Sequence, residues 1–67
     1  MRIQRQNTNP EHMFDDSVIV RQNATAADFR ELEQKAKTRG IFERSGIDRQ
    51  NHVFFTIKTG YRLTLVD

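Results

Sequence analysis

HVFFTIKTGYRLTLVD, residues 52–67, decides the fold of this chain. Apolar and polar side chains alternate over residues 53–57 and again over residues 61–66. A period of two residues is typical of a β-strand that buries one face. The three residues between the two runs, Lys58-Thr59-Gly60, contain a glycine and predict a tight turn. We therefore predict a β-hairpin at the end of the chain.

The length of the hairpin loop decides which residues face each other. A two-residue loop would set Ile57 opposite Arg62 and mix the two faces. A three-residue loop makes one face wholly apolar, and it puts Gly60 at the position that favours a left-handed backbone. The cross-strand pairs that it predicts are Ile57 with Tyr61, Phe55 with Leu63, and Val53 with Leu65. This register leaves Phe54 on the opposite face.

Residues 23–40 carry the signals of a helix. Thr25 is the expected N-cap, and Asp28 follows three residues later, as in a capping box. Apolar residues recur at helical spacing at Ala26, Phe29, Leu32 and Ala36. Gly40 suits the position just after the last turn, and Ile41 is placed to contact Ala36 in a Schellman stop. We predict one helix between these caps.

The remaining elements are strands. Residues 17–21 form a compact β-branched run, and residues 41–44 form a short strand before Ser45-Gly46, which is either a turn or a bulge. We predict an α+β fold in which a single α-helix packs on one face of a small antiparallel β-sheet, in the order β-α-β-β-β, with or without an extra N-terminal strand. Residues 1–16 are expected to be a polar arm or an edge strand, and residues 17–67 the α+β domain.

The apolar positions of these elements define the predicted core. It consists of Val18, Val20, Phe29, Leu32, Ala36, Ile41 or Phe42, Val53, Phe55, Ile57, Tyr61, Leu63 and Leu65.

Length and composition limit the class of protein. A chain of 67 residues buries a small core, and such chains often gain stability from a disulfide, a metal or a partner chain. The sequence has no cysteine, so disulfides and thiolate metal sites are excluded, and self-association or a protein partner is the expected supplement. No apolar run is long enough to span a bilayer, and residues 1–6 lack a signal-peptide core. We expect a cytoplasmic location and no membrane partner.

The charge distribution of the chain is not that of a strong nucleic-acid-binding protein, but its arginine content indicates an interaction surface. The formal net charge is +2, from eleven basic residues interleaved with nine acidic ones. A clustered basic stripe is typical of nucleic-acid-binding proteins, and it is absent here. Eight of the basic residues are arginine, which favours planar contacts with carboxylates, phosphates or bases.

Residue patterns for catalysis or cofactor binding are missing. His12 and His52 do not stand at a spacing typical of metal ligands, and neither Ser17 nor Ser45 lies in a nucleophile elbow. The three glycines are isolated and match no phosphate-binding loop. We therefore predict no enzyme activity, no cofactor, no metal site and no small-molecule substrate.

One alternative follows from a family resemblance. Gly40-Ile41-Phe42-Glu43-Arg44, followed by Asn51-His52-Val53-Phe54-Phe55, resembles the HicA toxins, small ribonucleases that cleave messenger RNA. The resemblance covers about half of the chain, and Gln50-Asn51 stands where that family has Gly-Ser before its histidine. It implies His52 as the acid/base residue and Arg44 or Arg49 as the phosphate contact.

The leading hypothesis is a protein-binding module. Phe54 lies on the face that the helix does not cover, and a large exposed aromatic ring indicates that something covers it in the working state. The cover is residues 1–14 of the chain, a second copy in a homodimer, or a target protein. In the last case the chain is a small inhibitor or adaptor, such as a bacterial or phage accessory protein. The predicted partner-binding residues are Phe54, Arg62, Thr64, Arg44 and Arg49. The alternative is a nucleic-acid-binding protein that uses the arginines and the exposed ring of Phe54.

Overall fold

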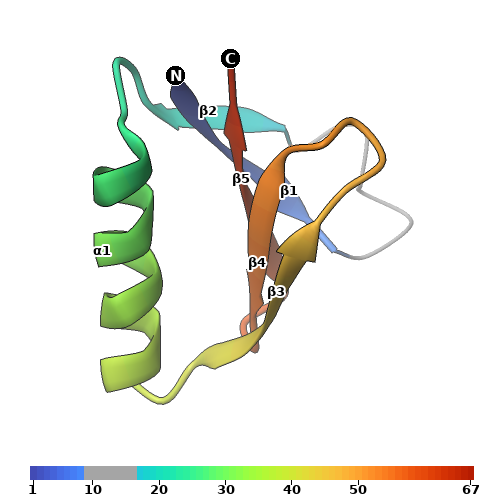
Figure 1. Ribbon diagram of the computed structural model, residues 1–67. Coiled ribbons are helices and arrows are strands. Elements are labelled where there is room, and N and C mark those ends of the chain that lie inside the picture. The colour runs from blue at the N-terminus through green and yellow to red at the C-terminus, as the bar shows by residue number, and fades with distance from the viewer. Residues whose placement is uncertain (9–16) are drawn as a thin grey trace.

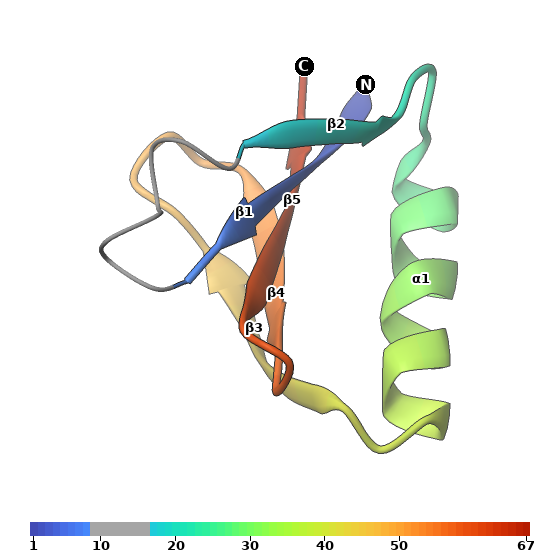
Figure 2. The ribbon, with the colours of Figure 1, turned by 180° about the vertical axis from the view of Figure 1, so that it is seen from behind.

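A five-stranded antiparallel sheet forms the framework of the described chain, and one helix lies along one side of it (Figures 1 and 2). The structure is a computed structural model that describes residues 1–8 and 17–67. The elements follow in the order β1 (Arg2–Asn7), β2 (Val18–Arg21), α1 (Ala26–Thr38), β3 (Phe42–Ile47), β4 (Val53–Ile57) and β5 (Tyr61–Val66). The strand order in the sheet is β2-β1-β5-β4-β3. This is the predicted α+β fold, with the extra N-terminal strand present.

The C-terminal hairpin has the predicted register. Ile57 pairs with Tyr61 and Phe55 pairs with Leu63. The backbone N–H of Gly60 donates to the carbonyl of Ile57 at 3.1 Å, and Gly60 has a φ of 99°. A positive φ is costly for residues with a Cβ, so glycine at this position makes the three-residue loop possible.

The helix has the predicted caps and is shorter than residues 23–40. The Thr25 hydroxyl accepts from the Asp28 N–H, and the Asp28 carboxylate accepts from the Thr25 N–H, which completes the capping box. At the other end the Gly40 N–H donates to Lys37 and the Ile41 N–H donates to Ala36, the two bonds of a Schellman stop. These bonds start the helix at Ala26 and end it at Thr38.

The position of β1 differs from our expectation of an arm or an edge strand. β1 lies between β2 and β5 and pairs antiparallel with both, so it is an inner strand. Ile3 pairs with Leu65 and is only 2% exposed. Ile3 is the only apolar residue of a polar strand, and an inner position depends on backbone pairing on both sides rather than on apolar content. Residues 9–16 lie outside the described residues.

Strand β3 also differs in detail from the prediction. It runs without interruption from Phe42 to Ile47, through the Ser45-Gly46 pair that we expected to form a turn or a bulge. The irregularity in its pairing with β4 lies earlier, between Phe42 and Arg44. An extra residue at that point changes the strand direction locally.

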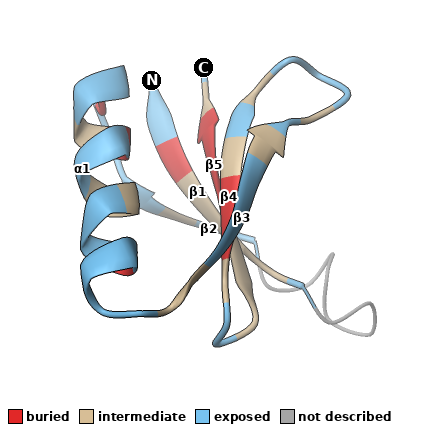
Figure 3. Cartoon of the chain, turned by 60° about the horizontal axis from the view of Figure 1, so that its bottom comes forward, coloured by how far each residue is buried: buried red, intermediate tan, exposed pale blue. Residues whose placement is uncertain are grey.

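The core lies between α1 and the sheet (Figure 3). The predicted core residues that are buried are Phe29, Ala36, Phe55, Leu63 and Leu65, with Leu32, Ile41, Phe42 and Ile57 packed against them. The rings of Phe29 and Phe42 both contact Phe55, at centroid distances of 5.1 and 6.2 Å. Ile3 and Ala24 are buried as well, and the prediction missed both.

Four residues of the predicted core are not in it. Val18, Val20 and Val53 are 42%, 45% and 45% exposed, and Tyr61 is half-buried with the guanidinium of Arg5 over its ring at 4.8 Å. Two reasons apply. Val18 and Val20 lie on the outer strand β2, and one helix about 10 Å across does not cover a five-stranded sheet whose outer strands are about 19 Å apart. Val53 and Tyr61 are the first residues of the inner strands β4 and β5, so they lie at the ends of the sheet rather than at its centre.

Candidate functional site

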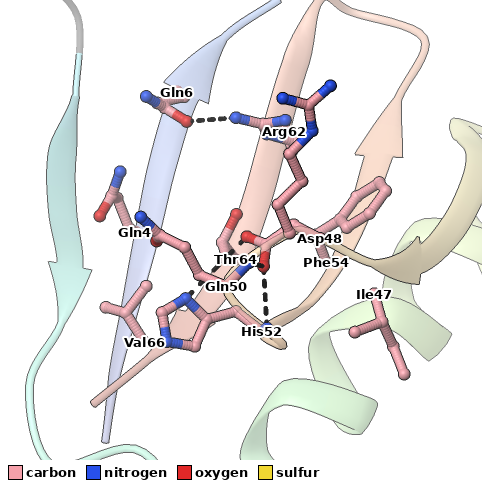
Figure 4. Close-up of a pocket in the computed structure, with 11 residues that line it drawn as sticks. Gln4, Gln6, Ile47, Asp48, Gln50, His52, Phe54, Arg62, Thr64 and Val66 are labelled. Carbon is pink, nitrogen blue, oxygen red and sulfur yellow. Dashed lines mark hydrogen bonds and ion pairs between the residues drawn. The ribbon is translucent and has the colours of Figure 1, made fainter.

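The side of the sheet away from α1 carries a broad hollow, and we call this side the open face. Its side chains alternate with the core residues along β1, β4 and β5. The hollow has a volume of about 550 Å³. Its described lining consists of Gln4, Gln6, Ile47, Asp48, Arg49, Gln50, His52, Phe54, Arg62, Thr64 and Val66 (Figure 4). The open face is therefore polar, apart from a few apolar side chains.

Phe54 lies on β4 between two small neighbours. It pairs with Thr64 on β5 and with Gly46 on β3. The ring lies across Gly46, because a Cβ placed on that glycine would lie 3.4 Å from two ring carbons of Phe54. The ring is half-buried in this position and is not part of the core cluster. Phe54 is thus on the open face, as its place in the alternation predicted.

Arg62 is held between two side chains of the open face (Figure 4). One terminal nitrogen of its guanidinium donates to the amide oxygen of Gln6 at 2.7 Å. The guanidinium carbon lies 5.8 Å from the centroid of the Phe54 ring, within cation–π range. Gln6 lies directly opposite Arg62 in the β1–β5 pairing, so the backbone register brings the two together.

The loop between β3 and β4 forms one wall of the hollow. Its conformation is set by Asp48, whose carboxylate accepts from the backbone N–H groups of Gln50 and His52, both at 2.9 Å. Asn51 has a φ of 65°, and asparagine tolerates this left-handed conformation better than most residues. The loop places Arg49 and Gln50 at the hollow.

His52 lies beside two carboxylates. Its Nδ1 is 3.9 Å from a carboxylate oxygen of Asp48, and its Nε2 is 3.9 Å from a carboxylate oxygen of Asp67. Both distances are too long for hydrogen bonds, so each contact is an ion pair only when the imidazole is protonated. No group of three or more His, Cys, Asp or Glu side chains that could hold a metal ion occurs within residues 1–8 and 17–67.

The five residues that we predicted as partner-binding are not all in one place. Phe54, Arg62, Thr64 and Arg49 line the hollow. Arg44 does not line it and instead lies on the edge strand β3, exposed, opposite Thr56.

Sequence reasoning missed the contribution of β1. Gln4 and Gln6 line the hollow, and they alternate with Ile3 and Arg5. This alternation was a signal that could have marked the segment as a strand with one polar face.

No family model, curated protein or solved structure matches the chain. In the part of the chain that the structure describes, α1 is too short and too polar to cross a membrane. The function is therefore argued from the site alone.

Proposed function

We propose that this chain is a small non-enzymatic module that binds another protein on its open face, as an inhibitor or an adaptor. The observation that carries the proposal is the hollow around Phe54 and Arg62. Its described lining includes a phenyl ring and two arginines, but neither lysine nor glutamate. Aromatic residues and arginine are enriched in protein interfaces, whereas lysine and glutamate are depleted there.

The order of these side chains supports binding. Arg62 is already bonded to Gln6 and lies against Phe54 in the free chain. A side chain that is ordered before binding loses less conformational entropy when a partner arrives. The pair of Phe54 and Arg62 therefore has the properties of an interface anchor.

The partner is a different protein rather than a second copy of this chain. In a two-fold dimer the patch meets a copy of itself, so the interface would gather Arg49 and Arg62 from both copies against one lining carboxylate, Asp48, from each. Like charges placed together at an interface disfavour association. This argues against a homodimer that uses the open face.

Nucleic-acid binding is a weaker alternative for the same residues. A base stacks on an aromatic ring only if one face of the ring is free. The Phe54 ring lies across Gly46, with the Arg62 guanidinium 5.8 Å from its centroid. A base would therefore have to displace the guanidinium to stack on the ring, whereas a protein can contact Phe54 and Arg62 together as they stand.

The HicA-like ribonuclease also stays a prediction, with an electrostatic argument against it. The carboxylates of Asp48 and Asp67 lie 3.9 Å from the His52 imidazole and would repel a phosphate placed at that imidazole, where the toxin alternative needs it. Replacing His52 with alanine should leave any RNA cleavage unchanged, and a loss of cleavage in that variant would support the toxin alternative.

Two adjacent residues offer a matched test of the proposal. Phe54 and Val53 lie side by side on β4 and point to opposite faces, and Val53 is 45% exposed. A partner isolated from the host should first be purified and its affinity for the wild-type chain measured by calorimetry. We expect Phe54→Asp to weaken this affinity by about a hundredfold, the effect of losing an interface anchor. We expect Val53→Asp to leave it nearly unchanged.

Circular dichroism should confirm that both variants are folded. Equal affinity of the two variants would contradict the proposal. A light-scattering mass of a dimer that Phe54→Asp converts to a monomer would contradict it too, because the occupant of the open face would then be a second copy.

A further inference from the structure

We infer that the partner presents an acidic segment to the open face, with an Asp or Glu carboxylate on Arg62. This inference rests on the proposed function and adds the chemistry of the partner. The charge of the open face favours an acidic partner. Arg49 and Arg62 line the hollow and Arg44 lies on the adjoining strand. Among the described residues, neither Arg44 nor Arg49 has an ion pair.

Two carboxylates at the hollow do not balance its arginines. One oxygen of Asp48 accepts two backbone N–H groups of its own loop, which orients the carboxylate and leaves its charge in place. The carboxylate of Asp67 lies 3.9 Å from the imidazole of His52. Three arginines stand against these two acids, Arg49 and Arg62 in the lining and Arg44 on the adjoining strand, so the face keeps an excess of positive charge for a partner to neutralise.

The hydrogen-bonding capacity of Arg62 also favours a carboxylate. A guanidinium has five N–H donors, and the bond to Gln6 uses one of them on a neutral acceptor. The remaining donors can receive a carboxylate through two parallel bonds, which are shorter and stronger than bonds to a neutral group. Because Gln6 and Phe54 already hold the guanidinium, the carboxylate meets a preformed site.

Neutral hydrogen-bonding side chains lie beside the arginine. Gln4 and Gln50 line the hollow, and the side chain of neither makes a hydrogen bond within the described part of the chain. A carboxamide offers both a donor and an acceptor, so these two can bond the backbone of an extended segment. A peptide supplies such backbone groups between its carboxylates.

Three probes separate the possible occupants. The first is a twelve-residue peptide of alternating Asp and Leu, the second is the same peptide with Asn in place of Asp, and the third is a twelve-nucleotide oligothymidylate. Each is titrated into the wild-type chain and followed through backbone amide chemical shifts. We expect the acidic peptide to shift the signals of Gln4, Phe54, Arg62 and Thr64, and the other two probes to leave them in place.

A matched pair of variants tests the role of Arg62. Arg62→Gln removes the charge on the open face, and Arg30→Gln removes an exposed charge on α1. We expect the first to weaken acidic-peptide binding by about tenfold or more and the second by less than about twofold.

The results of these titrations either support or overturn the inference. Equal losses in the two variants, equal shifts with the Asn peptide, or stronger shifts with the oligonucleotide would each overturn it. The proposed function would survive that failure if Phe54→Asp still abolished binding of the purified partner and Arg62→Gln did not.

Discussion

The two faces of the sheet use the same strands and have opposite chemistry. On the covered side Phe55 is 1% exposed and lies among apolar side chains. On the open face its neighbour Phe54 is half-buried among arginine, glutamine and threonine. Alternation thus sorts side chains between two faces, and the position of α1 decides which face becomes the core.

The largest expected effect separates the two phenylalanines. Phe55→Ala removes a ring from the centre of the core and should cost about 3–5 kcal/mol, a large part of the stability of a small domain. Phe54→Ala should cost much less, because that ring is only half-buried. Urea denaturation followed by circular dichroism measures both. Similar losses in the two variants would mean that the faces do not differ in their contribution to stability.

A second prediction concerns the helix that makes one face the core. Thr25→Ala removes the N-cap hydroxyl that accepts from Asp28 and should cost about 1 kcal/mol. In a domain of this size that is a fall in Tm of about 4–8 °C. Thr38→Ala is the control, because Thr38 ends the same helix and is exposed. An equal fall in Tm for Thr38→Ala would contradict a specific role of the Thr25 hydroxyl in the cap.

A third prediction tests a polar atom of the open face. Thr56 and Thr64 are both 5% exposed, but only the hydroxyl of Thr56 is among the buried atoms that lack a hydrogen-bond partner in the described chain. Burying an unpaired hydroxyl is unfavourable, so Thr56→Val should raise the free energy of unfolding by about 1 kcal/mol. Thr64→Val should give no such gain. A loss of stability in Thr56→Val, measured by urea denaturation, would show that its hydroxyl is paired.

The smallest effect is a pH dependence confined to the helix cap. Hydrogen bonds from the backbone and side chain of Thr25, and then the charge of Arg21, lower the pKa of Asp28 below its ordinary value of 3.8. The unfolded chain therefore takes up this proton more readily than the folded one. The contribution of the carboxylate to stability is complete above its ordinary pKa and disappears as the pH falls through the lowered value.

Asp28→Asn removes this titration. The stability difference between the wild-type chain and Asp28→Asn should be largest near neutral pH and should shrink as the pH falls below 3.8. Thermal unfolding at a series of pH values measures it. A difference that stays constant down to about pH 2 would show that the Asp28 carboxylate contributes nothing to the cap.

The part of the candidate site that comes from residues close together in the sequence was predictable. Phe54, Arg62 and Thr64 belong to one hairpin, whose loop length sets their register. Gln6 could not be assigned to the site in this way, because it reaches Arg62 across a pairing of strands that are 56 residues apart at this contact. Arg44 was predicted at the site and lies outside the hollow, on the edge strand β3.

Local sequence is enough to specify the hairpin, the helix with both of its caps, and the division of the last two strands into an apolar and a polar face. These features depend on residues a few positions apart, through alternation, helical spacing and local hydrogen bonds. Three features follow only from the packing of the whole chain: the inner position of β1, the exposure of Val18, Val20 and Val53, and the glutamines of β1 that complete the hollow. Pairing between distant segments, and the part of a sheet that one helix covers, depend on how all the elements pack, so no short stretch of residues encodes them.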